Sequence, residues 1–299
     1  MVLAMDRKTI LLAAGGDERF AGLCRLLAEK QLCTIYTLGF GDKLEDVLGL
    51  RTLTEISELR HQPDMLVLPL PLTADGVHLR APFHTGSPIL LRYLLDLCHK
   101  GTRVYCGKAD EAFRAECRER GLPLCDYLDD EAFTVKNAAA TAEAAVTLAC
   151  GLRRKTLFGS RVLVLGGGRI AKSLCRLLIA YGARVFCAAR SPEQRVWADL
   201  SGAEGVPLNA IPEPERIDLV FSTVPRTVFG EAELTSLRRD CLLIELGSLP
   251  GGIDEKAAGH LGRPLVRALS LPGKTVPDSA SEWLAELILE KEAETCEKN

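Results

Sequence analysis

The sequence has no uninterrupted apolar stretch of about 18 residues, the length that a membrane-spanning helix needs. Charge of neither sign dominates: 37 Lys and Arg stand against 40 Asp and Glu, which gives a net charge of −3. Such a balance provides no broad basic surface for a polyanion. We therefore expect no membrane partner, no nucleic-acid partner and a place in the cytosol.

Paired cysteine motifs are also missing. The 11 cysteines include no Cys-x-x-Cys pair, and most lie in apolar runs, where a free cysteine behaves as a small core residue. The odd number gives no complete disulfide framework, and the spacing matches no zinc motif. The sequence thus predicts no metal site and a reducing compartment.

A histidine suitable for acid–base catalysis is lacking. A two-domain dehydrogenase that acts on 2-hydroxy acids needs a histidine after the last strands of its cofactor domain. Here His260 precedes the last strand-like run, at residues 264–268, and the other four histidines occur before residue 100. No Ser–His–Asp order is indicated either, so we expect neither chemistry.

Strand-like and helical patterns alternate along the whole chain, which predicts an α/β fold with parallel sheets. The predicted strands are residues 8–14, 33–38, 65–68, 103–106, 122–126, 161–165, 183–188, 218–222, 241–246 and 264–268. The predicted helices include residues 18–30, 89–99, 110–120 and 279–291.

The length suits two domains. We expect an N-terminal domain over residues 1–130, completed by a C-terminal helix over 279–295. An alanine-rich connecting helix is expected over residues 131–154, and a second domain over residues 155–270. The cleft between two such domains is the default place for a substrate.

The most informative segment is Gly166-x-Gly168-x-x-Ala171, which directly follows a buried strand and opens a helix. Its first glycine suits a tight turn, its second lets a pyrophosphate approach the backbone, and the small alanine permits close helix–strand packing. The helix start, with Arg169 and Ile170, offers unpaired N–H groups to phosphates. The segment therefore predicts that the second domain is an open, Rossmann-like sheet that binds a dinucleotide.

The next predicted strand ends in Ala189-Arg190-Ser191. A site specific for NAD usually has Asp or Glu at this place, to bind the ribose 2′-hydroxyl. Arg190 can instead pair with a 2′-phosphate and Ser191 can donate to it, which favours NADP. The alternative is an arginine that merely lies on the surface at a strand end.

Later strand ends carry further candidates. Thr223, Val224 and Pro225 follow a strand where such folds place the nicotinamide half of the cofactor, with Thr223 as a ribose contact. Ser248 follows the next strand, in a glycine-rich turn. Lys274 lies in a loop before the last helix, where it can hold a carboxylate or transfer a proton, or simply face solvent.

Candidates in the first half are less distinctive. Asp17 follows Gly15-Gly16 and is as good a helix N-cap as a catalytic acid. Ser87 suits a cap or turn, or equally a donor into the cleft. Lys108 follows a strand end, where it either binds an anion or lies on the surface without such a role. Thr141 and Glu143 lie among the alanines of the connecting helix, where buried polar groups need partners, which favours a role in the cleft. We expect Thr141 to bind substrate, and Asp17 and Glu143 to orient ring groups or to move a proton.

These segments together resemble the family of the A subunit of dipicolinate synthase from spore-forming bacteria. The resemblance covers most of the chain and is most specific in the Pro-Gly-Gly and Leu-Pro-Gly-Lys segments. It rests on Gly15-Gly16-Asp17, Pro69-Leu-Pro71, Asn137 to Glu143, Gly166 to Ala171, Ala189-Arg190-Ser191, Thr223-Val-Pro225, Pro250-Gly-Gly252-Ile-Asp254 and Leu271-Pro-Gly-Lys274.

The resemblance implies a plan like that of formate/glycerate dehydrogenase and S-adenosylhomocysteine hydrolase, with two Rossmann-like domains bridged by long helices. It implies an NADP-dependent dehydrogenase that works with a flavoprotein-like B subunit in the mother cell during sporulation. The substrate would be hydroxy-tetrahydrodipicolinate, and the product pyridine-2,6-dicarboxylate. A homodimer is compatible with this plan.

Two segments depart from the family pattern. The family commonly has a basic residue where Leu249 stands, and Ala-Pro-Lys-Thr-Ala-Gly where this chain has Val276 to Ser281, including Asp278. Arg226, directly after Pro225, is then the expected replacement cation for the dicarboxylate. Two alternatives stay open: an NADP oxidoreductase for another small carboxylate, and a protein that senses NADP without catalysis.

Overall fold

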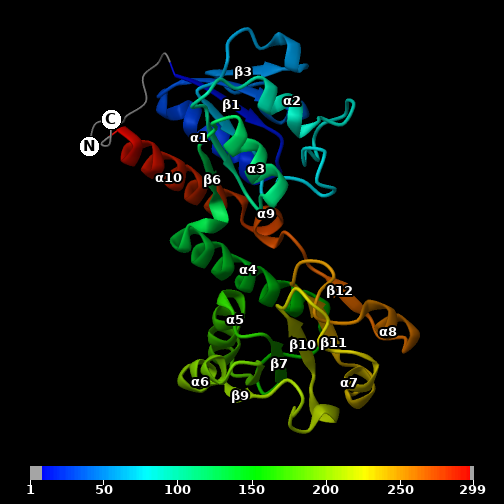
Figure 1. Ribbon diagram of the computed structural model, residues 1–299. Helices are drawn as coiled ribbons and strands as arrows, with labels where there is room; N and C mark the ends of the chain where they lie inside the picture. The colour runs from blue at the N-terminus through cyan, green and yellow to red at the C-terminus, as the bar shows by residue number, and fades with distance from the viewer. Residues whose placement is uncertain (1–8, 297–299) are drawn as a thin grey trace. The chain divides into compact units, whose positions relative to one another are not determined.

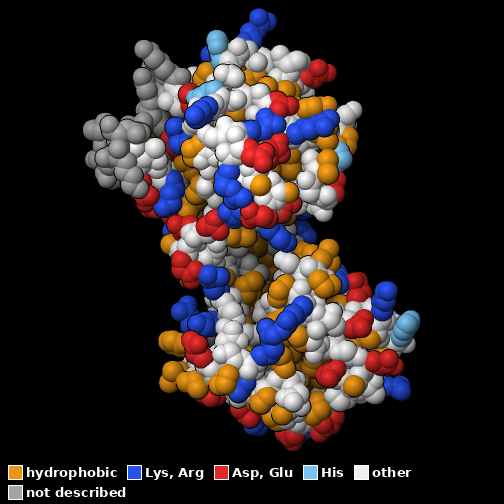
Figure 2. Space-filling model, viewed as in Figure 1, with side chains coloured by type: hydrophobic (Ala, Val, Ile, Leu, Met, Phe, Trp, Pro, Cys, Tyr) orange, Lys and Arg blue, Asp and Glu red, His pale blue; other side chains and the backbone are white. Residues whose placement is uncertain are grey.

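The computed structural model describes residues 9–296, which form two compact units. Of these, residues 9–134 and 276–296 form unit 1, and Val135–Thr275 form unit 2. Each unit contains a parallel sheet flanked by helices (Figure 1), which confirms the predicted fold class. Among the described residues, no helix is both long and apolar enough to cross a membrane. Acidic and basic side chains are interspersed on the visible face of each unit (Figure 2).

The sheet of unit 1 has the strand order β3-β2-β1-β4-β5-β6. Successive strands are added on one side of β1 up to β3 and on its other side from β4 onward, so the strand order reverses between β1 and β4. Both faces of β1 are buried: Leu11 and Ala13 join one core cluster, and Leu12 and Ala14 join the other. This explains the continuous apolar run in the sequence. The strands are β1 (Ile10–Ala14), β2 (Thr34–Leu38), β3 (Leu50–Leu53), β4 (Met65–Val67), β5 (Arg103–Cys106) and β6 (Leu124–Asp126).

The helices of unit 1 include one from the far end of the chain, α10. It packs on α1, where the hydroxyl of Ser281 donates to the carbonyl oxygen of Arg19 at 2.7 Å. A Cβ on Gly22 would overlap that hydroxyl, so the glycine permits the close approach. The helices are α1 (Glu18–Lys30), α2 (Leu91–Asp96), α3 (Glu111–Glu119) and α10 (Pro277–Cys296), with 3-10 turns at Gly41–Leu44, Ile56–Glu58 and Tyr127–Asp129.

The sheet of unit 2 repeats this topology with the order β12-β11-β10-β7-β8-β9. The strand order reverses between β7 and β10, the place where open parallel sheets bind ligands. Alternate residues of β7 again face two separate core clusters. The strands are β7 (Arg161–Leu165), β8 (Arg184–Ala188), β9 (Glu204–Val206), β10 (Leu219–Ser222), β11 (Leu242–Glu245) and β12 (Leu265–Arg267).

The helices of unit 2 are mostly short. Helix α4 (Glu131–Leu152) is the exception, and it begins in unit 1 and ends in unit 2. The others are α5 (Arg169–Ala180), α6 (Pro192–Leu200), α7 (Glu231–Ser236), α8 (Glu255–His260) and α9 (Leu271–Thr275), with a 3-10 turn at Pro214–Arg216.

The structure differs from the sequence prediction at several elements. Strands β3 and β9 were not predicted, and the helix expected over residues 89–99 is confined to α2. Lys274 lies in the short helix α9, not in a loop. The predicted first strand began at Lys8, which lies outside the described residues.

Candidate functional site

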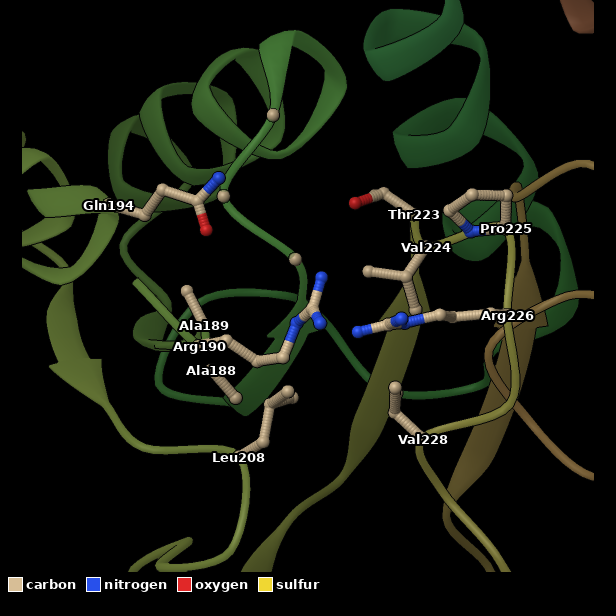
Figure 3. A pocket seen from close by; sticks show the side chains of 13 residues that line it. Ala188, Ala189, Arg190, Gln194, Leu208, Thr223, Val224, Pro225, Arg226 and Val228 are labelled. Atoms are coloured by element: carbon tan, nitrogen blue, oxygen red, sulfur yellow. The ribbon is translucent and has the colours of Figure 1, made fainter. Parts of the chain in front are cut away.

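Unit 2 contains a pocket of about 300 Å³ at the carboxyl ends of β7, β8 and β10 (Figure 3). It therefore lies beside the point where the strand order reverses. The lining contains arginines but neither Asp nor Glu. Its residues are Gly166, Gly167, Gly168, Ala188, Ala189, Arg190, Gln194, Leu208, Thr223, Val224, Pro225, Arg226 and Val228.

The glycine turn forms one wall of this pocket. Gly166 has a φ of 110°, and a Cβ there would overlap the hydroxyl of Thr223. Gly168 is the N-cap of α5 and faces open space, with no atom within 4 Å of the position of a Cβ. A phosphate can therefore approach the N–H groups and the positive dipole end at the start of α5.

The residues that directly follow the glycine turn and Arg190 are not part of the pocket lining. Ala171 is fully buried, and Ile170 packs against the core of unit 2, so neither lines the pocket. Arg169 begins α5. Ser191 is the N-cap of α6, but its side chain makes no capping hydrogen bond.

Thr223 is fixed by the neighbouring strand. Its backbone N–H and its hydroxyl both donate to the carbonyl oxygen of Leu165, at 2.9 and 2.8 Å. The hydroxyl proton is thus used inside the protein, and the oxygen lone pairs remain to accept a hydrogen bond from a ligand. Val224 and Pro225 continue the lining from this strand end.

Two exposed arginines dominate the electrostatics of the pocket. The guanidinium groups of Arg190, after β8, and Arg226, after β10, point toward one another across it (Figure 3). Arg195 donates to the carbonyl oxygens of Ala189 and Arg190, at 3.0 and 2.8 Å, which fixes the backbone that carries Arg190. The arrangement favours an anionic ligand.

A second loop near this edge of the sheet is shaped by Glu245, which ends β11 and is completely buried. Its carboxylate accepts from the backbone N–H groups of Gly247, Gly252 and Ile253, at 2.7, 2.8 and 3.0 Å. Burial raises the pKa of this carboxyl group above its usual value. Ser248 is exposed in the loop that Glu245 holds. The sequence analysis did not identify Glu245.

In unit 1, Asp17 is the N-cap of α1 and pairs with a buried arginine. Its carboxylate accepts from the Nε and Nη2 atoms of Arg19, at 2.9 and 2.8 Å, and from the backbone N–H of that residue. Arg19 also donates to the carbonyl oxygen of Leu70 at 2.5 Å. Capping, one of the two roles considered for Asp17, is thus observed.

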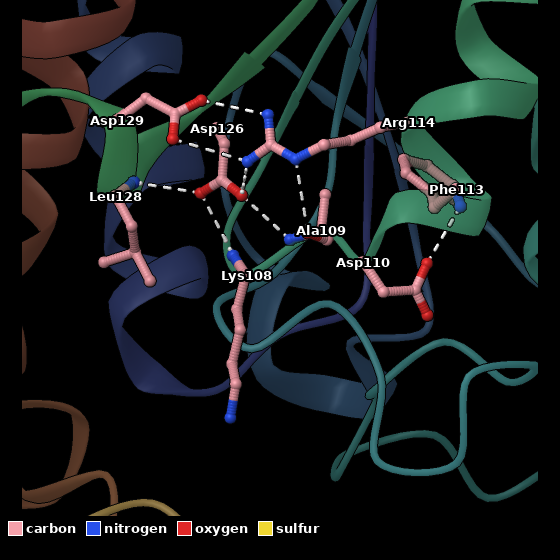
Figure 4. Close-up of polar contacts among 8 residues, drawn as sticks. All are labelled: Lys108, Ala109, Asp110, Phe113, Arg114, Asp126, Leu128 and Asp129. Atoms are coloured by element: carbon pink, nitrogen blue, oxygen red, sulfur yellow. Dashed lines mark hydrogen bonds and ion pairs between the residues drawn. The ribbon is translucent and has the colours of Figure 1, made fainter. Parts of the chain in front are cut away.

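Lys108 lies beside a carboxylate network that fixes its backbone (Figure 4). The carboxylate of Asp126, 2% exposed, accepts from the N–H groups of Lys108 and Ala109, at 3.0 and 2.8 Å, and from Arg114 at 2.8 Å. Lys108 has a φ of 62°, and its exposed side chain extends away from Asp126. Its ammonium group is thus presented to solvent near the carboxyl end of β5.

The other candidates are spread over both units. Thr141 is buried, and its hydroxyl donates to the carbonyl oxygen of Asn137 at 2.7 Å within α4. The expectation that Glu143 is buried among the alanines is wrong, because Glu143 lies on the exposed side of α4. Ser87 and Lys274 are also exposed. Among residues 9–296, no group of three or more His, Cys, Asp and Glu is placed to hold a metal ion.

Comparison with known proteins gives one consistent match. Residues 11–128 match the family model of the N-terminal domain of the dipicolinate synthase A subunit. The A subunit of dipicolinate synthase from Bacillus subtilis (strain 168) is 27% identical over 276 residues, or 92% of each chain.

Solved structures agree with this match. The A chain of dipicolinate synthase from Bacillus subtilis has a TM-score of 0.85, at 26% identity and 99% coverage of each chain. The A subunit from Bacillus halodurans has a TM-score of 0.86, at 25% identity, with 95% of this chain and 98% of that chain covered. A transhydrogenase from Sinorhizobium meliloti shares the fold, with a TM-score of 0.63 at 15% identity, and the match covers 94% of this chain and 91% of that chain.

Proposed function

We propose that the chain belongs to the family of the dipicolinate synthase A subunit and that it catalyses the NADP-dependent conversion of hydroxy-tetrahydrodipicolinate to pyridine-2,6-dicarboxylate. The observation that carries the proposal is the pocket of unit 2, where a glycine turn, a helix N-terminus and Arg190 meet. A flavoprotein-like B subunit is the proposed partner, and the mother-cell cytosol during sporulation the proposed location.

The residues of the pocket fit a dinucleotide with a 2′-phosphate. The open space at Gly168 and the N–H groups of α5 suit the pyrophosphate. Arg190 and Ser191 are assigned to the 2′-phosphate, because they follow β8, where the adenosine ribose lies in this fold. Thr223 and Pro225 are assigned to the nicotinamide half.

The reaction consists of the loss of one water molecule and the removal of one hydride and one proton, which together make the ring aromatic. Bound NADP+ supplies the hydride acceptor. We assign Lys274 to a substrate carboxylate and Ser248 to the neighbourhood of the nicotinamide. Asp17 and Glu143 are assigned to orienting ring groups or moving a proton. Further candidates for substrate binding are Ser87, Lys108, Thr141 and Arg226.

The dinucleotide assignment predicts a selective effect of Arg190→Ala. Loss of a charge-assisted hydrogen bond to phosphate should weaken NADP+ binding roughly 10- to 100-fold, while NAD+ binding stays unchanged. Titration calorimetry measures both. Arg239→Ala is the matched control, since Arg239 is exposed at the opposite, amino end of β11. Equal or tighter binding of NAD+ by the unmodified chain would contradict the assignment.

Catalysis is tested with the purified chain, its B subunit, hydroxy-tetrahydrodipicolinate and NADP+. The ultraviolet absorbance of the aromatic product should rise together with that of NADPH. NADP+ binding without product would favour the sensing alternative. Turnover of a different small carboxylate alone would favour the other oxidoreductase.

A further inference from the structure

Arg226 shares a pocket with Arg190 although the two arginines come from different strand ends. They follow β10 and β8, which lie on opposite sides of β7 in the sheet. Their guanidinium groups nevertheless converge on the same space (Figure 3). Two like charges that face one another raise the free energy of the empty pocket, and an anion between them lowers it.

The surroundings leave both guanidinium groups available. Among the described residues, neither group has an assigned hydrogen bond or ion pair, and no Asp or Glu lines the pocket. The backbone beneath Arg190 is fixed by Arg195, so one arginine is partly positioned before a ligand arrives. Planar guanidinium groups bind phosphate oxygens in pairs, so an anion with several oxygens can engage both.

The position of the pair selects one phosphate of the dinucleotide. The pyrophosphate belongs at the glycine turn and the start of α5, whereas Arg190 follows β8, beside the adenosine ribose. Because Arg226 points toward Arg190, it also faces the ribose. A phosphate monoester carries about −1.5 to −2 charges near neutral pH, enough to pair with two cations.

We propose that Arg226 is a second arginine for the 2′-phosphate and that both arginines together determine the preference for NADP+ over NAD+. This inference rests on the proposed use of NADP. It assigns Arg226 to cofactor recognition rather than to a substrate carboxylate. The 2′-phosphate is thus bound from two sides, by Arg190 after β8 and by Arg226 after β10.

The test uses the full chain and compares four ligands by calorimetry: NADP+, NAD+, 2′,5′-ADP and 5′-AMP. In Arg226→Ala, affinity for the two ligands with a 2′-phosphate should fall roughly 10- to 100-fold. Affinity for NAD+ and 5′-AMP should stay within a factor of about two. Arg226→Lys should recover only part of the loss, because an ammonium group lacks the planar fork. Arg239→Ala should match the unmodified chain.

The double variant Arg190→Ala, Arg226→Ala tests whether the two arginines act on one group. If they do, the combined loss should differ from the product of the single losses, as it does for groups that share a partner. Phosphate selectivity should disappear in the double variant.

Two outcomes separate this inference from the proposed function. If Arg190→Ala removes the phosphate preference and Arg226→Ala does not, Arg226 has another role, while the use of NADP stands. A higher KM for the carboxylate substrate, with an unchanged Kd for NADP+, would assign Arg226 to the substrate. If the unmodified chain shows no preference for a 2′-phosphate, both proposals fail.

Discussion

Glu245 shows how one buried carboxylate organises a loop. Three backbone N–H groups, two of them from residues seven and eight positions later, converge on its oxygens. In this way the chain after β11 is folded back on the strand end, and Ser248 is held in an exposed position. The raised pKa shows that burial opposes ionisation despite these three donors.

A pH-dependent stability follows from that raised pKa. The folded state binds the proton of Glu245 more tightly than the unfolded state does, so the contribution of Glu245 to folding is largest below about pH 4.5, its ordinary pKa. This contribution is lost as pH rises through the folded pKa. Relative to Glu245→Gln, which cannot ionise, the free energy of unfolding of the unmodified chain should therefore fall as pH rises.

Urea denaturation of both proteins between about pH 4 and pH 8 measures this difference, since titration of all other groups largely cancels. At acid pH, Glu245→Gln should also cost about 1–3 kcal/mol, because its amide N–H atoms face backbone donors. A difference that is constant or grows with pH would show that Glu245 folds without a raised pKa.

Residues of the site were predictable to unequal degrees. The glycine turn and Arg190 are local signals, because their roles depend on a strand, a turn and a helix that are contiguous in sequence. The contribution of Glu245 depends on a loop that returns after seven residues, and the place of Arg226 depends on the pairing of β10 with β7. No local pattern encodes either relation.

At the level of elements, the turn after β5 depends on a side chain from β6. The carboxylate of Asp126 accepts hydrogen bonds from the backbone N–H groups of Lys108, Ala109 and Leu128, and it forms an ion pair with Arg114. This network holds Lys108 in a left-handed backbone conformation that side chains seldom adopt. The conformation of the turn therefore depends on a side chain from β6, which pairs with β5 but lies further along the sequence.

Asp126→Ala should destabilise the protein by about 3 kcal/mol, because it leaves the backbone N–H groups of Lys108, Ala109 and Leu128 without their acceptor and removes the buried one of the two carboxylates that pair with Arg114. Asp129→Ala is the matched control: Asp129 pairs with the same Arg114, but its side chain is 64% exposed. The control should change stability by less than about 1 kcal/mol. Urea denaturation measures both, and equal effects would mean that burial does not distinguish the two carboxylates.

The sequence predicts those elements whose apolar pattern is strong within the element itself, and it misses those that depend on pairing with other strands. Strand β7 and helix α1 have the predicted bounds because their apolar periodicity is strong and their ends are marked by turn residues. Strands β3 and β9 lie at the edges of their sheets. Half of the residues of β3 are exposed, so it lacks the apolar run of a central strand.

On the scale of the whole molecule, unit 2 holds all residues of the pocket shown in Figure 3. It also has its own core clusters on both faces of its sheet. Nucleotide binding should therefore not require unit 1. The division falls inside α4, whose first turn belongs to unit 1.

A fragment of residues 131–275, which keeps α4 intact, should fold and bind NADP+ with an affinity within about tenfold of the full chain. Circular dichroism during urea denaturation measures folding, and calorimetry measures binding. A cooperatively folded fragment that does not bind NADP+ would show that the pocket depends on unit 1. The shorter fragment 135–275 should bind as well but be less stable.

The return of α10 to unit 1 has a consequence for biosynthesis. As the ribosome releases the chain, residues 135–275 emerge before residues 277–296. Unit 2 therefore has its complete sequence while unit 1 still lacks helix α10, which covers part of its core. Until translation reaches that point, the apolar surface that Leu284 and Ile288 later cover stays open. A nascent chain that stalls in between exposes this surface to chaperones and to aggregation, although it already carries all residues of unit 2 and of its pocket.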